Sequence, residues 1–223
     1  PSGAIHLAHL HNLSQDLDDL RTGRKDVYED IRSALASNKS ANAGYLTGRW
    51  FEVRIAWLLM KMGFQYEMPD PPDFTIKEPN LNVECYGPRL EIGGNIFKKT
   101  TRSFKSKEGK YRGENWFDEG KNVFLMDSTW LVRAAKKEVT TQNKSLPNNL
   151  LAALQRIVEK TKFDLVISFV FGHAFVDDED ERTTSCVYAP SDIEDGNILQ
   201  FKNQLLTKFE EENVGLRLPD LPN

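Results

Sequence analysis

The first third of the chain has apolar residues at helical spacing. Residues 13–38 contain two such stretches, broken near Thr22 and Gly23, and a third runs from about Tyr45 to Met62. Because Gly63 can adopt the conformation that ends a helix, we expect the third helix to stop there. Its most regular apolar positions are Phe51, Ile55, Leu58, Leu59 and Met62. Most of its other positions are apolar too, which predicts a helix buried on most sides.

Shorter apolar runs follow, and these are typical of β-strands. We expect strands at residues 64–68, 73–77, 81–86, 122–126 and 163–171, with further helices at 128–140, 150–158 and 198–212. The segment Glu78-Pro79-Asn80 predicts a turn that joins the second strand to the third. In the third strand side chains alternate between the two faces of the sheet, so Glu84 and Tyr86 should share a face that Cys85 does not.

Helices that precede, separate and follow strands favour an α/β fold, with a mixed central sheet flanked by helices. A polar stretch from Asn38 to Gly44 separates the first two expected helices from the rest. We therefore expect an N-terminal helical extension over residues 1–44 and an α/β domain over residues 45–223.

Composition narrows the class of protein. The chain has 223 residues, of which 39% are hydrophobic, and a formal net charge of −4. Its two cysteines, Cys85 and Cys186, predict free thiols rather than a disulfide framework. No apolar run approaches the roughly 20 residues that span a bilayer, and no signal peptide is recognisable. These features indicate a cytoplasmic protein that does not associate with a membrane.

Three carboxylates lie on neighbouring predicted elements. Glu52 is a charged residue in the largely apolar third helix, Asp73 opens the second strand, and Glu84 lies late in the third. If the two strands are hydrogen-bonded neighbours, Asp73 and Glu84 can hold one Mg²⁺ or Mn²⁺, with the Cys85 carbonyl as a further oxygen ligand. Two alternatives remain open: Asp70 in place of Asp73, and Glu52 as a surface residue of its helix.

Residues 45–127 resemble the PD-(D/E)XK nuclease superfamily. The resemblance is carried by Pro72-Asp73 and by Glu84-Cys85-Tyr86, in the element order helix, three strands, a variable segment and a further strand. It implies a restriction-endonuclease-like αβββαβ core and Mg²⁺-dependent cleavage of DNA, with Asp73, Glu84, Tyr86 and Glu52 as catalytic residues. This family usually has lysine where Tyr86 stands, and Lys77, Lys98 or Lys99 are alternative sources of that charge.

Residues 96–112 are strongly basic, with seven lysines or arginines against one glutamate, and aromatic residues are interleaved. Such a segment can follow a phosphate backbone and stack on bases. The expected nucleic-acid-binding residues are Lys98, Lys99, Arg102, Lys105 and Lys107. The alternative interpretation is a solvated loop, which Ser103, Ser106 and Gly109 favour.

Two functions follow from these patterns. The first is a metal-dependent phosphodiesterase that acts on DNA, with a homodimer expected by analogy with other nucleases. The second is a nuclease-like fold that has lost catalysis and binds nucleic acid or protein; the neutral phenol of Tyr86 and the acidic net charge favour it. An unrelated α/β enzyme is a third possibility, although the chain has no Gly-rich phosphate loop and no nucleophile elbow.

Overall fold

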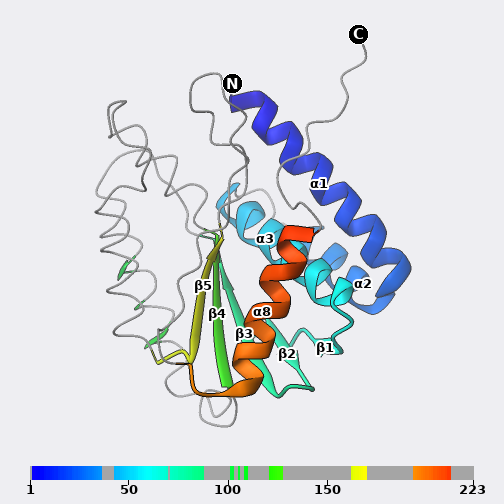
Figure 1. Cartoon of the computed structure of the whole chain (residues 1–223). Helices are drawn as coiled ribbons and strands as arrows, with labels where there is room; N and C mark the ends of the chain where they lie inside the picture. Colours follow the sequence, from blue (N-terminus) through cyan, green and yellow to red (C-terminus); the bar gives the residue numbers. More distant parts are fainter. Residues whose placement is uncertain are drawn as a thin grey trace.

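The computed structural model describes residues 2–36, 43–69, 71–87, 101–102, 105, 108–109, 121–127, 162–169 and 193–211 (Figure 1). Its helices are α1 (Ser2–Gly23), α2 (Lys25–Leu35), α3 (Ala43–Lys61) and α8 (Gly196–Glu211). Its strands are β1 (Tyr66–Glu67), β2 (Phe74–Ile76), β3 (Leu81–Tyr86), β4 (Lys121–Asp127) and β5 (Leu165–Phe169). The predicted third strand has the bounds of β3.

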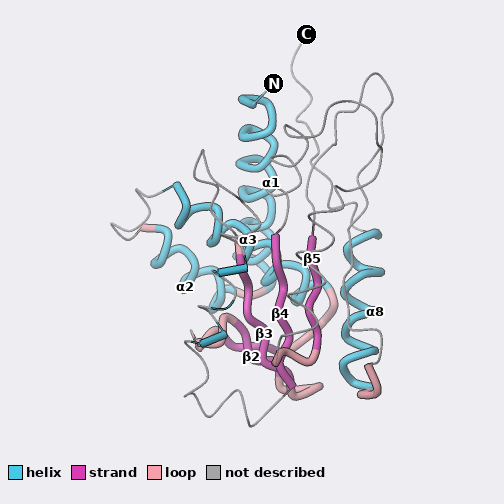
Figure 2. The backbone as a smooth tube through the Cα atoms, turned by 90° about the vertical axis from the view of Figure 1, so that its left-hand side faces the viewer, coloured by secondary structure: helices cyan, strands magenta, loops and turns pink. Residues whose placement is uncertain are grey.

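The five strands form one mixed sheet in the order β1-β2-β3-β4-β5. The first three are antiparallel neighbours, whereas β4 runs parallel to both β3 and β5. The carboxyl ends of β3, β4 and β5 therefore lie at the same end of the sheet, and β2 begins at that end. In Figure 2 the strands from β2 to β5 follow one another across the sheet, with α8 beside β5. The α/β class and the mixed sheet are as the sequence predicts.

One face of the sheet is covered by helices. Val83 and Cys85 of β3, Val123 and Leu125 of β4, and Phe201 of α8 belong to the same buried core as α3. Phe169 of β5 links the two covering helices, because its ring packs against Phe51 of α3 and Phe209 of α8. Helices α1 and α2 pack on the far side of α3 (Figure 1). As its apolar pattern predicts, α3 is buried on most sides.

The end of α3 follows from one glycine. Gly63 has a φ of 78°, a conformation that costs a residue with a Cβ more than it costs glycine. The Gly63 N–H donates to the Met60 carbonyl, and the Phe64 N–H donates to the Leu59 carbonyl. These two bonds satisfy carbonyls that the end of the helix would leave without partners, and the chain turns towards β1.

Buried polar contacts join α1 to α3. Arg54 and Asp16 form an ion pair of 3.0 Å in which both side chains are almost fully buried. One turn along, Asp19 accepts a hydrogen bond from the Trp57 indole N–H at 2.8 Å and pairs with Lys61 at 2.9 Å. Burial raises the pKa of Asp16 to about 7, against the opposing effect of Arg54. The pair is therefore costly to desolvate, and neither partner tolerates loss of the other.

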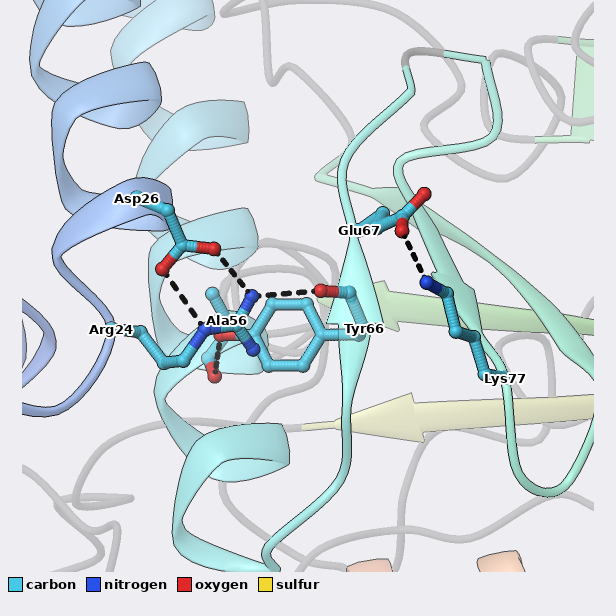
Figure 3. Close-up of polar contacts among 6 residues, drawn as sticks. All are labelled: Arg24, Asp26, Ala56, Tyr66, Glu67 and Lys77. Carbon is cyan, nitrogen blue, oxygen red and sulfur yellow. Dashed lines mark hydrogen bonds and ion pairs between the residues drawn. The ribbon is translucent and has the colours of Figure 1, made fainter.

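A second cluster joins the α1–α2 junction to β1, and Figure 3 shows it. Arg24 donates to both carboxylate oxygens of Asp26 and, at 2.8 Å, to the backbone carbonyl of Tyr66. Its guanidinium also lies over the Tyr66 ring, 4.3 Å from the centroid. The Tyr66 hydroxyl donates to the Ala56 carbonyl at 2.7 Å, and burial raises its pKa, so it remains a donor. The cluster thereby connects α2, α3 and the edge of the sheet.

Leu20 of α1 and Val27 and Ile31 of α2 lie in the same hydrophobic core as α3 and the sheet. The boundary near residue 44 stays a prediction, since packing of this kind does not decide whether the two parts fold separately. The helices predicted at 128–140 and 150–158 lie outside the described residues. Within the described part of the chain, no helix has both the length and the apolar character needed to cross a membrane.

We predict that Asp16→Ala lowers the free energy of unfolding by about 3–5 kcal/mol, because it leaves the Arg54 guanidinium buried without its carboxylate. Asp18→Ala is the matched control, since Asp18 pairs with Arg21 on the exposed side of the same helix. That variant should change stability by less than about 1 kcal/mol. Urea unfolding at pH 8 measures both, and equal effects of the two substitutions would contradict this view of the pair.

Candidate functional site

Asp73 and Glu84 lie opposite each other where β2 and β3 meet. Phe74 pairs with Val83 in the antiparallel register of these strands. Continuing that register by one residue places Asp73 across from Glu84, and residues opposite each other in such a pair project to the same face. The predicted neighbourhood of these two strands is confirmed. Both residues are buried, with Asp73 8% and Glu84 1% exposed.

Asp73 is held by the backbone of β3. Its Oδ2 accepts a hydrogen bond from the Cys85 N–H at 2.6 Å. Asp73 comes just before Phe74, the first paired residue of β2. Its carboxylate therefore takes the place of the backbone carbonyl that a longer β2 would offer to the Cys85 N–H. In an extended strand the N–H and C=O of one residue point towards the same neighbouring strand. The Cys85 carbonyl therefore also points towards β2. Asp73 and this carbonyl are thus oxygen donors on one side of β3.

Glu84 and Tyr86 share the face of the sheet that points away from α3, as the alternation predicts. Val83 and Cys85 belong to the core under α3 and α8, whereas Tyr86 packs against Phe124 with ring centroids 6.1 Å apart. In the β3–β4 register Glu84 pairs with Phe124 and Tyr86 with Met126. Carboxylates at this depth are retained when they are hydrogen-bonded, paired with a cation or coordinated to a metal ion.

Glu52 lies on α3 and is paired on its own helix. Its Oε2 accepts a hydrogen bond from Arg49 Nη1 at 2.5 Å, and both side chains are mostly buried. Glu52 is therefore not the exposed surface residue that the alternative interpretation describes. Within the described residues, no three Asp, Glu, His or Cys side chains are gathered closely enough to hold a metal ion. The structure thus brings Asp73 and Glu84 together and does not add Glu52 as a third direct ligand.

The donors that are present fit Mg²⁺ or Mn²⁺ bound through few protein ligands. Mg²⁺ usually keeps several waters and binds one or two carboxylates together with substrate phosphate oxygens. Asp73, Glu84 and the Cys85 carbonyl supply only oxygen, which suits a hard cation and not Zn²⁺, which favours nitrogen and sulfur. The Cys85 side chain points into the hydrophobic core and takes no part.

Lys77 does not supply the charge that Tyr86 lacks. Its ammonium group pairs with Glu67 at 2.7 Å on the exposed surface. Asp73 and Lys77 flank the three residues of β2 at opposite ends, so about four residues of extended chain, roughly 13 Å, separate them. The alternatives Asp70, Lys98 and Lys99 lie outside the described residues.

Part of the basic segment is described. Arg102 and Lys105 are exposed, as phosphate-binding side chains must be. Glu108, the single acid among residues 96–112, is buried, and its Oε1 accepts a hydrogen bond from the Lys162 N–H at 2.6 Å. Its carboxylate is therefore shielded from solvent and binds the backbone shortly before β5. Lys107, like Lys98 and Lys99, lies outside the described residues.

Two charged residues that the sequence analysis does not name as site residues lie on elements around the candidate site. Arg49 is the hydrogen-bond partner of Glu52, and Asp127 is a buried acid at the end of β4. Asp127 follows an apolar strand directly, and the carboxyl ends of parallel strands are common places for functional residues, so that signal was available. The pairing of Arg49 with Glu52 also had a signal in the sequence, because residues three apart on a helix are neighbours.

Comparisons with protein-family models, with curated proteins and with solved structures give no significant match to this chain.

We predict that Asp73→Asn and Asp73→Ala differ in stability. The asparagine retains an oxygen that can accept from the Cys85 N–H, whereas alanine leaves that buried donor without its partner, at a cost of about 1–3 kcal/mol. Thermal or urea unfolding of both variants in EDTA measures the difference. Equal loss in the two variants would mean that the negative charge of Asp73, and not its hydrogen bond, supports the fold.

Proposed function

We propose that this protein is a Mg²⁺-dependent phosphodiesterase that cleaves DNA and has a restriction-endonuclease-like core. The observation that carries the proposal is the position of Asp73, which precedes β2 and accepts a hydrogen bond from the Cys85 N–H, where the register of β2 and β3 leads to Glu84. Two carboxylates and a backbone carbonyl at one end of a sheet are a donor set suited to a cation that also binds a phosphate. The sheet, with three antiparallel strands followed by a parallel fourth, agrees with the core that the sequence resemblance implies.

In this proposal Asp73 and Glu84 hold the metal ion through side-chain oxygens and Cys85 through its carbonyl. A bound Mg²⁺ stabilises negative charge on the phosphate and makes a coordinated water more acidic. The hydrogen bond from Cys85 fixes the orientation of Asp73, so the carboxylate need not be reordered when the cation arrives. Tyr86, on the face of Glu84, serves as a neutral hydrogen-bond donor to water or phosphate.

A catalytically inactive module that binds nucleic acid is the second candidate. The observation that favours it is the environment of Tyr86, whose ring packs against Phe124 and whose phenol carries no positive charge. Such a protein binds DNA and leaves it intact with every divalent cation. The two candidates therefore differ in a single assay.

We predict that supercoiled and linear DNA are cleaved with Mg²⁺ or Mn²⁺ and not with EDTA. Asp73→Asn and Glu84→Gln should each lower the rate by at least about 100-fold, because each removes a charged ligand and leaves the side chain a similar shape. Glu67→Gln, at an exposed acid that pairs with Lys77, is the matched control and should cleave normally. Cleavage that survives in both site variants contradicts the assignment; binding with no cleavage by the wild type supports the inactive module.

We also predict that DNA binding in EDTA weakens as the salt concentration rises. Arg102→Ala and Lys105→Ala should each weaken binding at low salt and reduce the slope of log K against log [salt] by about 1, since each removes a phosphate contact. Lys77→Ala, at an exposed lysine paired with Glu67, serves as the control. Fluorescence anisotropy of a labelled duplex measures all three, and unchanged slopes for Arg102 and Lys105 would place the DNA elsewhere.

A further inference from the structure

We propose that the ring of Tyr86 stacks on a nucleobase beside the phosphate bound at Asp73 and Glu84, so that the protein favours DNA in which this base is unpaired. The inference rests on the proposed function and names the substrate class of the same site. It gives the side chain at this position a role that lysine, which has no ring, cannot perform.

Tyr86 lies next to the proposed metal ligands on the same strand. It is the last residue of β3 and follows Cys85 directly. Glu84 precedes it by two residues, so their side chains share a face and their Cα atoms are roughly 6.5 Å apart in an extended strand. A single nucleotide can span such a distance between its phosphate and its base. One nucleotide can therefore contact both the metal ligands and the ring.

The ring of Tyr86 is supported from behind by two phenylalanines. It packs against Phe124 with ring centroids 6.1 Å apart, and Phe124 packs against Phe163 at 5.0 Å. In the register of β3 and β4, Tyr86 pairs with Met126, whereas Phe124 pairs with Glu84. The ring therefore leans back from the end of β3 towards the position of Glu84. A ring held in this way loses little conformational freedom when a base binds to it.

Tyr86 is the member of this aromatic row that solvent reaches. Phe124 and Phe163 are buried, with 0% and 4% of their surface exposed, whereas Tyr86 is partly exposed at the end of its strand. A tyrosine that is apolar on one side and open to water on the other is typical of binding surfaces. Every nucleobase offers a flat π face to such a ring, so this contact needs no particular base.

The chemistry of the side chain selects the form of the DNA. The phenol is neutral at physiological pH, so it contributes ring contact and a hydrogen bond rather than charge. In a duplex each base is paired and stacked between its neighbours, and a protein ring reaches its face only when the base leaves the stack. Tyr86 therefore favours single strands, frayed ends and flipped bases over intact duplex.

Exposed basic side chains lie on the same side of the sheet. Figures 1 and 2 show the described parts of residues 101–109 on the side of the sheet away from α1 and α3. Arg102 and Lys105 belong to this segment and are exposed. Tyr86 also lies on the face that points away from α3. Basic side chains that follow the backbone, together with an aromatic ring for the bases, are the combination that binds single-stranded nucleic acid.

The test compares the wild type with Tyr86→Phe, Tyr86→Leu and Tyr86→Lys. Tyr28→Leu is the matched control, because Tyr28 is another partly buried tyrosine, packed against the core from α2. Fluorescence anisotropy in EDTA measures binding to a labelled single strand and to an abasic strand of the same length, which keeps the phosphates and lacks the bases. The readout is the base preference, defined as the Kd for the abasic strand divided by the Kd for the single strand.

We expect the wild type to bind the single strand more tightly than the abasic strand. Tyr86→Leu should lower the base preference by about 5- to 100-fold, the range for loss of one stacked base. Tyr86→Phe keeps the ring and should keep the preference, and Tyr28→Leu should not change it. Tyr86→Lys should lose the preference while binding the abasic strand more tightly, because it replaces the ring with a charge. With Mg²⁺, the wild type should cleave the single strand faster than the duplex.

A base preference that is near 1 in the wild type, or that survives in both Tyr86→Leu and Tyr86→Lys, would overturn the proposal. A variant that merely misfolds loses binding to both strands equally, and the ratio separates that effect from loss of stacking. If the wild type cleaves DNA but shows no base preference, the stacking role fails and the phosphodiesterase stands. If it cleaves nothing, the phosphodiesterase fails, and the base preference in EDTA still decides the role of Tyr86.

Discussion

The burial of α3 is the constraint on which the rest of the structure depends. Its residues Phe51, Ile55, Leu58 and Leu59 are fully buried, and the helix packs on β3, on α8 and on the two N-terminal helices. Burying that many apolar side chains is the dominant favourable contribution to folding here, since each large one contributes about 1.5–3 kcal/mol. It also fixes the rotation of α3 about its axis. The polar residues of the helix therefore have defined positions, and Arg54 needs the buried carboxylate of Asp16.

The same packing decides which face of the sheet carries the candidate site. Because α3 covers the face of Val83 and Cys85, Glu84 and Tyr86 lie on the opposite face. The strand side of the site depends on a different interaction, the hydrogen bond from the Cys85 N–H to Asp73. This bond orients a carboxylate where the β2–β3 ladder stops. A carboxylate held in this way by main-chain geometry is preorganised.

Much of the framework could be predicted from the sequence, for local reasons. Helical spacing from Phe51 to Met62 predicted α3, and the glycine at position 63 ends it as expected. Alternation over residues 81–86 predicted β3 together with the separate faces of Glu84 and Cys85. These predictions succeed because period and turn chemistry are properties of short segments. Alternation did not separate Lys77 from the other possible sources of positive charge, because it indicates a face but not the distance along the strand, and Lys77 lies at the far end of β2.

By itself, then, the amino-acid sequence determined the elements, the α/β class and the pairing of an aspartate with a glutamate on neighbouring strands. Tertiary structure alone decided which charges meet. It turned Glu108 inward to the Lys162 N–H, and placed Asp16 beside Arg54 across two helices. The physical reason is that hydrophobic burial, which is nearly non-directional, sets how the elements pack, and polar side chains then find partners among residues distant in sequence.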